Sequence, residues 1–118
     1  MTPFEIATQS AKILSDKKAS NVSAVRINEV SSLADYMVFA TGNNSTHVKS
    51  LADELEFQLK NAGVSAHHIE GHRSDSWILL DYTDVIIHVF SDEAREYYSL
   101  DHLWQDGEML DLSDYVTD

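Results

Sequence analysis

Ionisable and aromatic side chains interrupt the most apolar stretch of the chain, residues 77–90, which reads WILLDYTDVIIHVF. Asp81, Asp84 and His88 are groups that could bind a metal ion or transfer a proton, and Trp77 is a large aromatic side chain. Such groups in a hydrophobic segment indicate one of two arrangements. They form a reaction centre built on a sheet, or they mark a sheet face that meets another molecule.

The stretch is typical of a β-hairpin with its turn at Tyr82 and Thr83, which predicts Leu80 opposite Val85 and Trp77 opposite His88. Because side chains alternate along a strand, one face is then purely aliphatic and is expected to form core. This aliphatic face consists of Ile78, Leu80, Val85, Ile87 and Val89. The opposite face, which we call the mixed face, consists of Trp77, Leu79, Asp81, Asp84, Ile86 and His88.

The mixed face has two interpretations that the residues alone leave open. A tryptophan anchor with carboxylates at its rim is the composition of a protein interface. Alternatively, one of the protein's own helices covers this face, and Trp77 and His88 find their hydrogen-bond partners internally.

Catalysis is the less favoured interpretation of the polar groups. The loop TGNNST (41–46) follows a predicted strand and opens a predicted helix, but it lacks the glycine and lysine pattern of a phosphate loop. The run HHIEGH (67–72) offers His68, Glu70 and His72 at alternate positions, yet Gly71 is expected to end the strand before His72, and no fourth ligand for a closed metal site is evident. A tight turn and a polar strand end explain both motifs, so no metal and no cofactor are predicted.

The remaining pattern predicts the elements that position the hairpin. Thr2, Pro3 and Glu5 form a helix start signal for residues 3–18, and an alternating strand follows at 22–29. A strand at 36–41, a helix capped by Ser45 and ended by Gly63, and a strand at 66–70 form a predicted parallel crossover unit. A short helix at 92–97 and a helical turn at 99–104 come after the hairpin.

Length and charge restrict the class of protein. A chain of 118 residues with 43% hydrophobic residues predicts one globular domain. The net charge is −12, and residues 92–118 contribute nine acidic side chains against one arginine. Such a chain repels phosphate backbones, so direct nucleic-acid readout is not expected, whereas a basic protein partner is favoured. Neither a signal peptide nor a membrane-spanning run is present, so a cytoplasmic location is predicted.

Three blocks in this order resemble the ribosomal silencing factor family RsfS, also called Iojap or DUF143. They are SSLADYMVFATGNNSTHVKSLAD (31–53), EGHRSDSWILLDYTDVIIHVF (70–90) and REYYSLDHLW (95–104). With the intervening helix, the resemblance extends over nearly all of residues 1–105, and residues 106–118 form an acidic extension that we expect to dock in part. The family's hairpin usually carries glycine at the position of Thr83.

The resemblance implies a single α/β domain with a mixed sheet of about five strands and helices packed on it. It also implies a shape like that of nucleotidyltransferases without their catalytic groups, and therefore no enzyme. The implied partner is the large ribosomal subunit, bound through ribosomal protein fourteen at the intersubunit face, where it blocks small-subunit joining under nutrient limitation. Several members look like homodimers. The expected partner-binding residues are Trp77, Leu79, Asp81, Tyr82, Asp84, Ile86, His88, Arg95 and Tyr98.

Two other hypotheses remain beside this one. The loop at 42–45 and the Asp81/Asp84 pair suggest a metal-dependent enzyme resembling nucleotidyltransferases. A structural dimerisation module that ignores ribosomes is the third.

Overall fold

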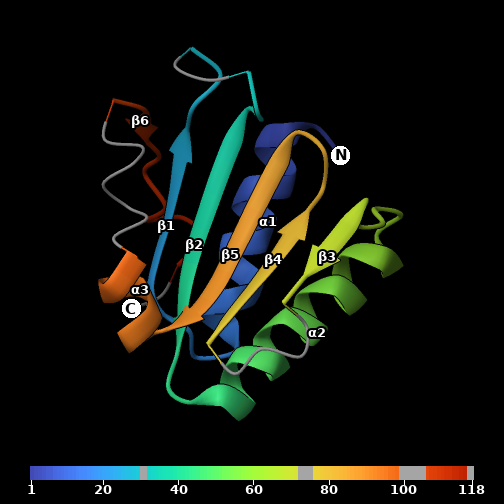
Figure 1. Cartoon of the computed structure of the whole chain (residues 1–118). Coiled ribbons are helices and arrows are strands. Elements are labelled where there is room, and N and C mark those ends of the chain that lie inside the picture. The colour runs from blue at the N-terminus through green and yellow to red at the C-terminus, as the bar shows by residue number, and fades with distance from the viewer. Residues whose placement is uncertain (30–31, 72–75, 99–105, 117–118) are drawn as a thin grey trace.

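A computed structural model describes residues 1–29, 32–71, 76–98 and 106–116, with side chains described to residue 96 of the third segment. The predicted helical turn at 99–104 lies outside the described residues. The elements in chain order are α1 (Pro3–Asp16), β1 (Ser20–Arg26), β2 (Tyr36–Gly42), α2 (Ser45–Asn61), β3 (His68–Glu70), β4 (Trp77–Asp81), β5 (Val85–Ser91), α3 (Asp92–Tyr98) and β6 (Glu108–Met109), as drawn in Figure 1.

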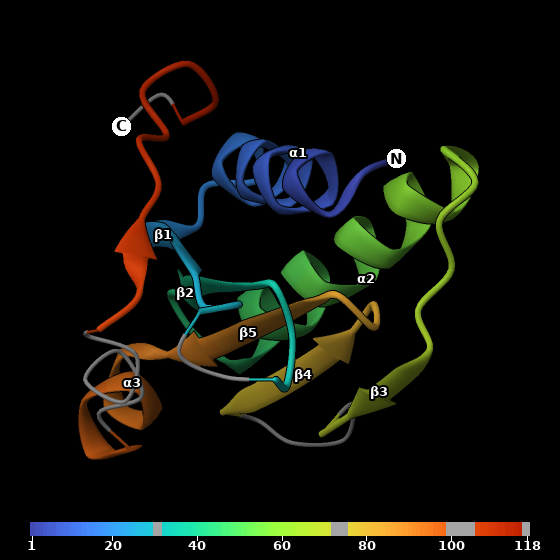
Figure 2. The same ribbon diagram turned by 90° about the horizontal axis from the view of Figure 1, so that it is seen from above.

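The strands form one mixed sheet in the order β3-β4-β5-β2-β1-β6. The β2–β5 pair is parallel and the other four pairs are antiparallel. Helices α1 and α2 cover one side of the sheet, and α3 lies on the other side beside the ends of β2 and β5 (Figure 2). The predicted α/β class with helices packed on a mixed sheet is confirmed, although the sheet has six strands rather than about five.

Local sequence explains how the two long helices begin. In α1 the Thr2 hydroxyl accepts from Glu5 N at 3.1 Å and Thr2 N donates to Glu5 Oε1 at 2.9 Å, which is the predicted capping box. In α2 the cap is Asn44, whose side chain accepts from His47 N at 2.8 Å. The prediction of Ser45 as the cap is therefore wrong by one residue, because the asparagine carbonyl reaches the free amide first.

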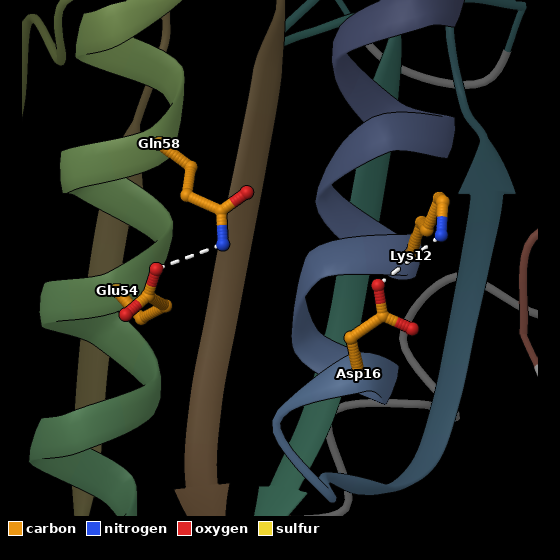
Figure 3. A network of polar contacts seen from close by, with 4 residues as sticks. All are labelled: Lys12, Asp16, Glu54 and Gln58. Carbon is orange, nitrogen blue, oxygen red and sulfur yellow. Dashed lines mark hydrogen bonds and ion pairs between the residues drawn. The ribbon is translucent and has the colours of Figure 1, made fainter.

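The two helices pack side by side over the sheet and also make polar contacts on their outer surfaces. Lys12 pairs with Asp16 at 3.2 Å along α1, and Gln58 donates to Glu54 at 2.8 Å along α2 (Figure 3). Lys17 reaches Glu54 at 3.7 Å and links the helices. These ion pairs are exposed, so they add little to the free energy of unfolding compared with the apolar contacts beneath them.

The two strands of the predicted parallel crossover run in the same direction, but they are not neighbours in the sheet. Strand β5 is parallel to β2, β4 is antiparallel to β5, and β3 is antiparallel to β4. Strand β3 therefore runs in the same direction as β2, as the β2-α2-β3 pattern predicts. The hairpin β4-β5 is inserted between them. This insertion puts residues 77–91 in the centre of the sheet, with β2 on one side and β3 on the other.

The hairpin register differs from the prediction. Leu80 lies opposite Ile87 rather than Val85, and Trp77 lies opposite Phe90 rather than His88. The turn is centred one residue later than predicted, since Tyr82 N still donates to Val85 O at 2.9 Å and Thr83 has a φ of +73°. A shift of two in register keeps the parity of the strands, so the aliphatic and mixed faces hold the predicted residues.

The acidic extension docks in part, as predicted. Met109 pairs with Val25 and Glu108 with Arg26, and Leu110 N donates to Ala24 O at 2.9 Å. Leu110 and Leu112 then pack against the main core. Residues 108–112 are therefore attached to the β1 edge, while the domain boundary expected at residue 105 stays a prediction.

Candidate docking surface

The mixed face forms a second, smaller hydrophobic cluster on the side of the sheet opposite α1 and α2. Ile86 and His88 are buried in it, with 6% and 5% of their surface exposed, whereas Trp77 and Leu79 are only half-buried against it. The cluster is completed by residues from β1, β2, β5, α3 and the loop before β2: Val25, Ile27, Ala34, Met37, Phe39, Phe90 and Ala94. The face is thus covered in its middle and accessible at Trp77 and Leu79.

A row of stacked rings crosses this face from β4 to β2. The Trp77 indole N–H donates to His88 Nδ1 at 3.1 Å, and the two ring centroids are 5.8 Å apart. The His88 ring stacks on Phe39 at 5.3 Å with an interplanar angle of 13°, and Phe90 lies beside both. We call Trp77, His88, Phe39 and Phe90 the aromatic row.

Arg95 closes the aromatic row at the α3 end. Its guanidinium carbon lies 5.3 Å from the centroid of Phe90 and 5.9 Å from that of Phe39. Its Nη1 donates to Asn21 O at 2.6 Å and to Thr41 Oγ1 at 2.9 Å. These contacts fasten α3 to β1 and β2 and give the half-buried Arg95 a structural role, while its expected part in partner binding stays a prediction.

The two aspartates of the mixed face lie at the turn, far from the tryptophan. Four residues of strand separate Trp77 from Asp81, or about 13 Å. The Asp81 carboxylate accepts from Thr83 N at 2.7 Å and stabilises the turn, while Asp84 is exposed. The face therefore has an aromatic end and an acidic end. At the acidic end the Asp81 carboxylate supports the turn, whereas the Asp84 carboxylate is exposed.

One of the predicted site residues, Tyr82, is not brought to this surface. Tyr82 is buried in the main core on the α2 side, where burial, and secondarily the negative charge of Glu56, raise its pKa to about 12. Its hydroxyl has no hydrogen-bond partner in the described part of the chain. Tyr98 ends α3, and its side chain lies outside the described residues.

Phe39 and Phe90 belong to the buried cluster of the mixed face, although the sequence interpretation left them out. Phe90 has the parity of His88 and could have been assigned to the mixed face directly. Phe39 is set opposite His88 only by the parallel β2–β5 pairing, which is a contact between segments far apart in the chain. Residues 36–41 are apolar on both sides of the strand, so their sequence does not show which side chains share the mixed face.

The catalytic alternatives gain no geometric support. Within the ranges that the structure describes, no three His, Asp or Glu side chains gather where they could hold a metal ion. His68 pairs with Glu70 at 3.0 Å at the sheet edge, and His72 lies outside those ranges. His47, at the start of α2, accepts from Asn43 N through Nδ1 at 2.9 Å and contacts Lys17 O through Nε2 at 2.9 Å. Both ring nitrogens therefore hold the loop rather than a ligand.

Fold and surface together define an α/β domain with a half-buried aromatic and acidic sheet face, which is a candidate protein-binding face. Residues 2–118 match the family model described as "Ribosomal silencing factor during starvation", and the chain belongs to this family, RsfS. None of the helices in the described ranges has the length and apolar character to cross a membrane.

Relatives and solved structures agree with this membership. The chain is 31% identical over 117 residues to the "Ribosomal silencing factor RsfS" of Halalkalibacterium halodurans, covering 99% of this chain and all of that one. It superposes with a TM-score of 0.86 on a crystal structure of a Chromobacterium violaceum protein, at 34% identity and with 96% and 93% of the two chains covered. It is 25% identical to mouse "Mitochondrial assembly of ribosomal large subunit protein 1" over 78% of this chain and 42% of that one.

Proposed function

We propose that this protein silences ribosomes by binding the large subunit through ribosomal protein fourteen and by excluding the small subunit from the same surface, which lowers translation under nutrient limitation. Membership of a family described as ribosomal silencing factors supports the ribosomal role. The observation that carries the binding mode is the mixed face, where Trp77 and Leu79 stay half-buried at the edge of an otherwise closed cluster.

Charge and shape favour a basic protein as the partner. The chain has a net charge of −12, and the hairpin turn presents the exposed Asp84 next to the backbone of Asp35, whose N–H donates to Asp84 O at 2.8 Å. Carboxylates at the rim of an interface speed association with a cationic surface and set its orientation. Trp77 supplies the type of large aromatic anchor that dominates binding free energy at the centre of interfaces.

Silencing of this kind needs no chemical step. A protein seated on the intersubunit surface of the large subunit competes with the small subunit for that surface, and the outcome follows the two concentrations and dissociation constants. The fraction of silenced large subunits therefore rises with the concentration of the factor. Excess small subunits are expected to reverse the effect.

A double variant, Trp77→Ala with Asp84→Arg, tests the proposed surface. It removes the aromatic anchor and reverses the exposed rim charge. We therefore expect its affinity for large subunits, measured by co-sedimentation at low salt, to fall at least about a hundredfold, the size of an interfacial hot spot. Asp84 is preferred over Asp81 because the Asp81 carboxylate also supports the turn. Circular dichroism confirms that the variant is folded.

The matched control is Phe57→Ala with Asp53→Arg on the outer surface of α2. Phe57 is 61% exposed, so this pair also removes an aromatic side chain and reverses a carboxylate, but on the other side of the sheet. The control is expected to sediment as the parent does. A folded Trp77/Asp84 variant that sediments as well as the control would disprove the surface.

Self-association is measured in the same material. Homodimers are implied for several family members, and the dimerisation hypothesis predicts a concentration-dependent dimer that ignores ribosomes. Sedimentation velocity of the free protein, followed by addition of large subunits, separates this outcome from ribosome binding.

A further inference from the structure

We propose that His88 is a positioning residue for docking, because its imidazole holds the Trp77 indole in the orientation that the partner meets. This inference rests on the proposed function, since it assumes that Trp77 is an anchor. It goes further by assigning a role to a buried residue that cannot touch the partner itself. His88 has only 5% of its surface exposed.

The hydrogen bond between the two rings determines the indole orientation. Trp77 Nε1 lies 3.1 Å from His88 Nδ1, and a nitrogen that accepts a hydrogen bond carries no proton. The imidazole must therefore be neutral, with its proton on Nε2. An indole N–H can donate and cannot accept, so this bond directs the N–H edge of the Trp77 ring toward His88.

His88 can act as a fixed acceptor because its own ring is clamped. It lies between Trp77 and Phe39, with centroid distances of 5.8 and 5.3 Å. Phe39 and Phe90 are backed in turn by the Arg95 guanidinium, which is tied to Asn21 O and Thr41 Oγ1. The aromatic row thus connects the anchor on β4 to the start of α3 through buried, stacked contacts.

An anchor that is ordered before binding loses less conformational entropy on binding. Releasing one large side chain costs roughly three- to tenfold in affinity on this account. His88 is thus expected to change large-subunit affinity without a contact to the subunit. The same release must be visible in the free protein, as faster exchange of the Trp77 indole proton.

Two substitutions at one position separate the acceptor from the ring. His88→Phe keeps the stacking and removes the acceptor, whereas His88→Asn places an amide oxygen near the former Nδ1 and keeps an acceptor. We expect His88→Phe to lower affinity for large subunits three- to tenfold and to speed indole proton exchange of Trp77 about tenfold or more. His88→Asn keeps an acceptor but loses the stacked ring that clamps it, so we expect it to lower affinity less than His88→Phe does.

The readouts are co-sedimentation with purified large subunits and ¹⁵N-indole NMR of the free protein, with the two tryptophan resonances assigned by a Trp77→Phe spectrum. A folded His88→Phe variant with parent affinity, or with an unchanged Trp77 exchange rate, overturns the proposal. If His88→Phe does not fold, β-(3-benzothienyl)alanine in place of Trp77 removes the N–H at constant shape, and parent-like affinity then overturns it.

Failure of the positioning role and failure of the proposed function give different results. If the parent protein itself does not sediment with large subunits, the proposed function fails, and the NMR comparison still decides whether His88 orders Trp77. If the parent binds and Trp77→Ala does not weaken it, Trp77 is no anchor and the docking role of His88 is overturned as well.

Discussion

The two faces of the β4-β5 hairpin are closed in different ways. On the aliphatic face every side chain is completely buried, under two helices of 14 and 17 residues (Figure 2). On the mixed face the cover formed by the described residues is α3, of seven residues, and the loop before β2. The rings of this face are held by directional contacts: the Trp77 hydrogen bond, the stacking of His88 and the hydrogen bonds of Arg95.

This difference separates the part that stabilises the fold from the part suited to recognition. Aliphatic packing is nondirectional and gains free energy in proportion to buried area, so a closed layer is the best use of it. A surface that must accept a partner cannot be closed. It can still be ordered, provided that hydrogen bonds and ring stacking fix side chains which remain accessible, and the mixed face has this property.

Truncation on either side of one strand pair provides the largest test of the comparison. Ile87→Ala, at a fully buried position of the aliphatic face, is expected to lower the free energy of unfolding by about 3 kcal/mol. Leu79→Ala, half-buried on the mixed face, is expected to cost less than about 1.5 kcal/mol while it weakens large-subunit binding. Urea unfolding and co-sedimentation measure the two quantities.

Equal destabilisation by both variants would contradict the division, and so would an unaltered affinity of Leu79→Ala for large subunits. Val89→Ala serves as a second aliphatic-face control, because Val89 is also fully buried and lies opposite Ile78 in the register. Its smaller side chain predicts a smaller loss than that of Ile87→Ala.

Parity is the part of this arrangement that the sequence determines. The alternation assigned the hairpin side chains that it sorted, 77–81 and 84–89, to the correct face, and that assignment is unaffected by the shift in register, because the shift is an even number of residues. The capping box at Thr2 was equally local and equally readable. Signals of this kind involve residues close together in the chain.

The features that the sequence interpretation missed depend on contacts between distant segments. Phe39 joins the aromatic row only through the parallel pairing of β2 with β5, and Arg95 reaches Asn21 and Thr41 across more than fifty residues of chain. Tyr82 was expected at the docking surface, yet with the later turn centre its N–H bonds to Val85 O and its side chain lies in the core. The sixth strand was missed because two residues carry no periodicity.

Tyr82 gives the second test, because it is the ionisable group of the hairpin that lies on the aliphatic side. Burial raises the pKa of its phenol from 10.0 to about 12, so the folded state favours the neutral form. The associated stability is fully present below pH 10 and is lost as the pH rises towards 12, where the unfolded chain ionises first. We expect the parent to lose about 2 to 3 kcal/mol in this window through Tyr82.

Tyr82→Phe removes this loss. Its free energy of unfolding, measured by urea titration, should change less between pH 10 and pH 12 than that of the parent. At neutral pH the variant should equal or slightly exceed the parent in stability, because the deleted hydroxyl is buried without a partner in the described residues. Tyr115→Phe, in the docked extension, controls for the loss of one phenol. The idea fails if Tyr82→Phe follows the parent's alkaline profile.

Thr83 gives the test with the smallest expected effect, and it lies in the turn that joins β4 to β5. Its φ of +73° is in the left-handed region, where a β-branched side chain is strained by roughly 1–2 kcal/mol and glycine is not. After subtraction of the backbone entropy that glycine adds to the unfolded chain, Thr83→Gly should raise the free energy of unfolding by about 0.5 to 1 kcal/mol.

The matched substitution is Thr83→Ala, which removes the branched side chain but keeps Cβ. If the strain comes from Cβ in the left-handed region, alanine recovers little of the gain and glycine recovers most of it. Both variants keep the 2.7 Å contact from the residue 83 amide to Asp81, so the register and the two faces are retained and large-subunit affinity should not change. A stability gain accompanied by altered affinity would instead show that the turn register, and not parity alone, sets the orientation of the mixed face.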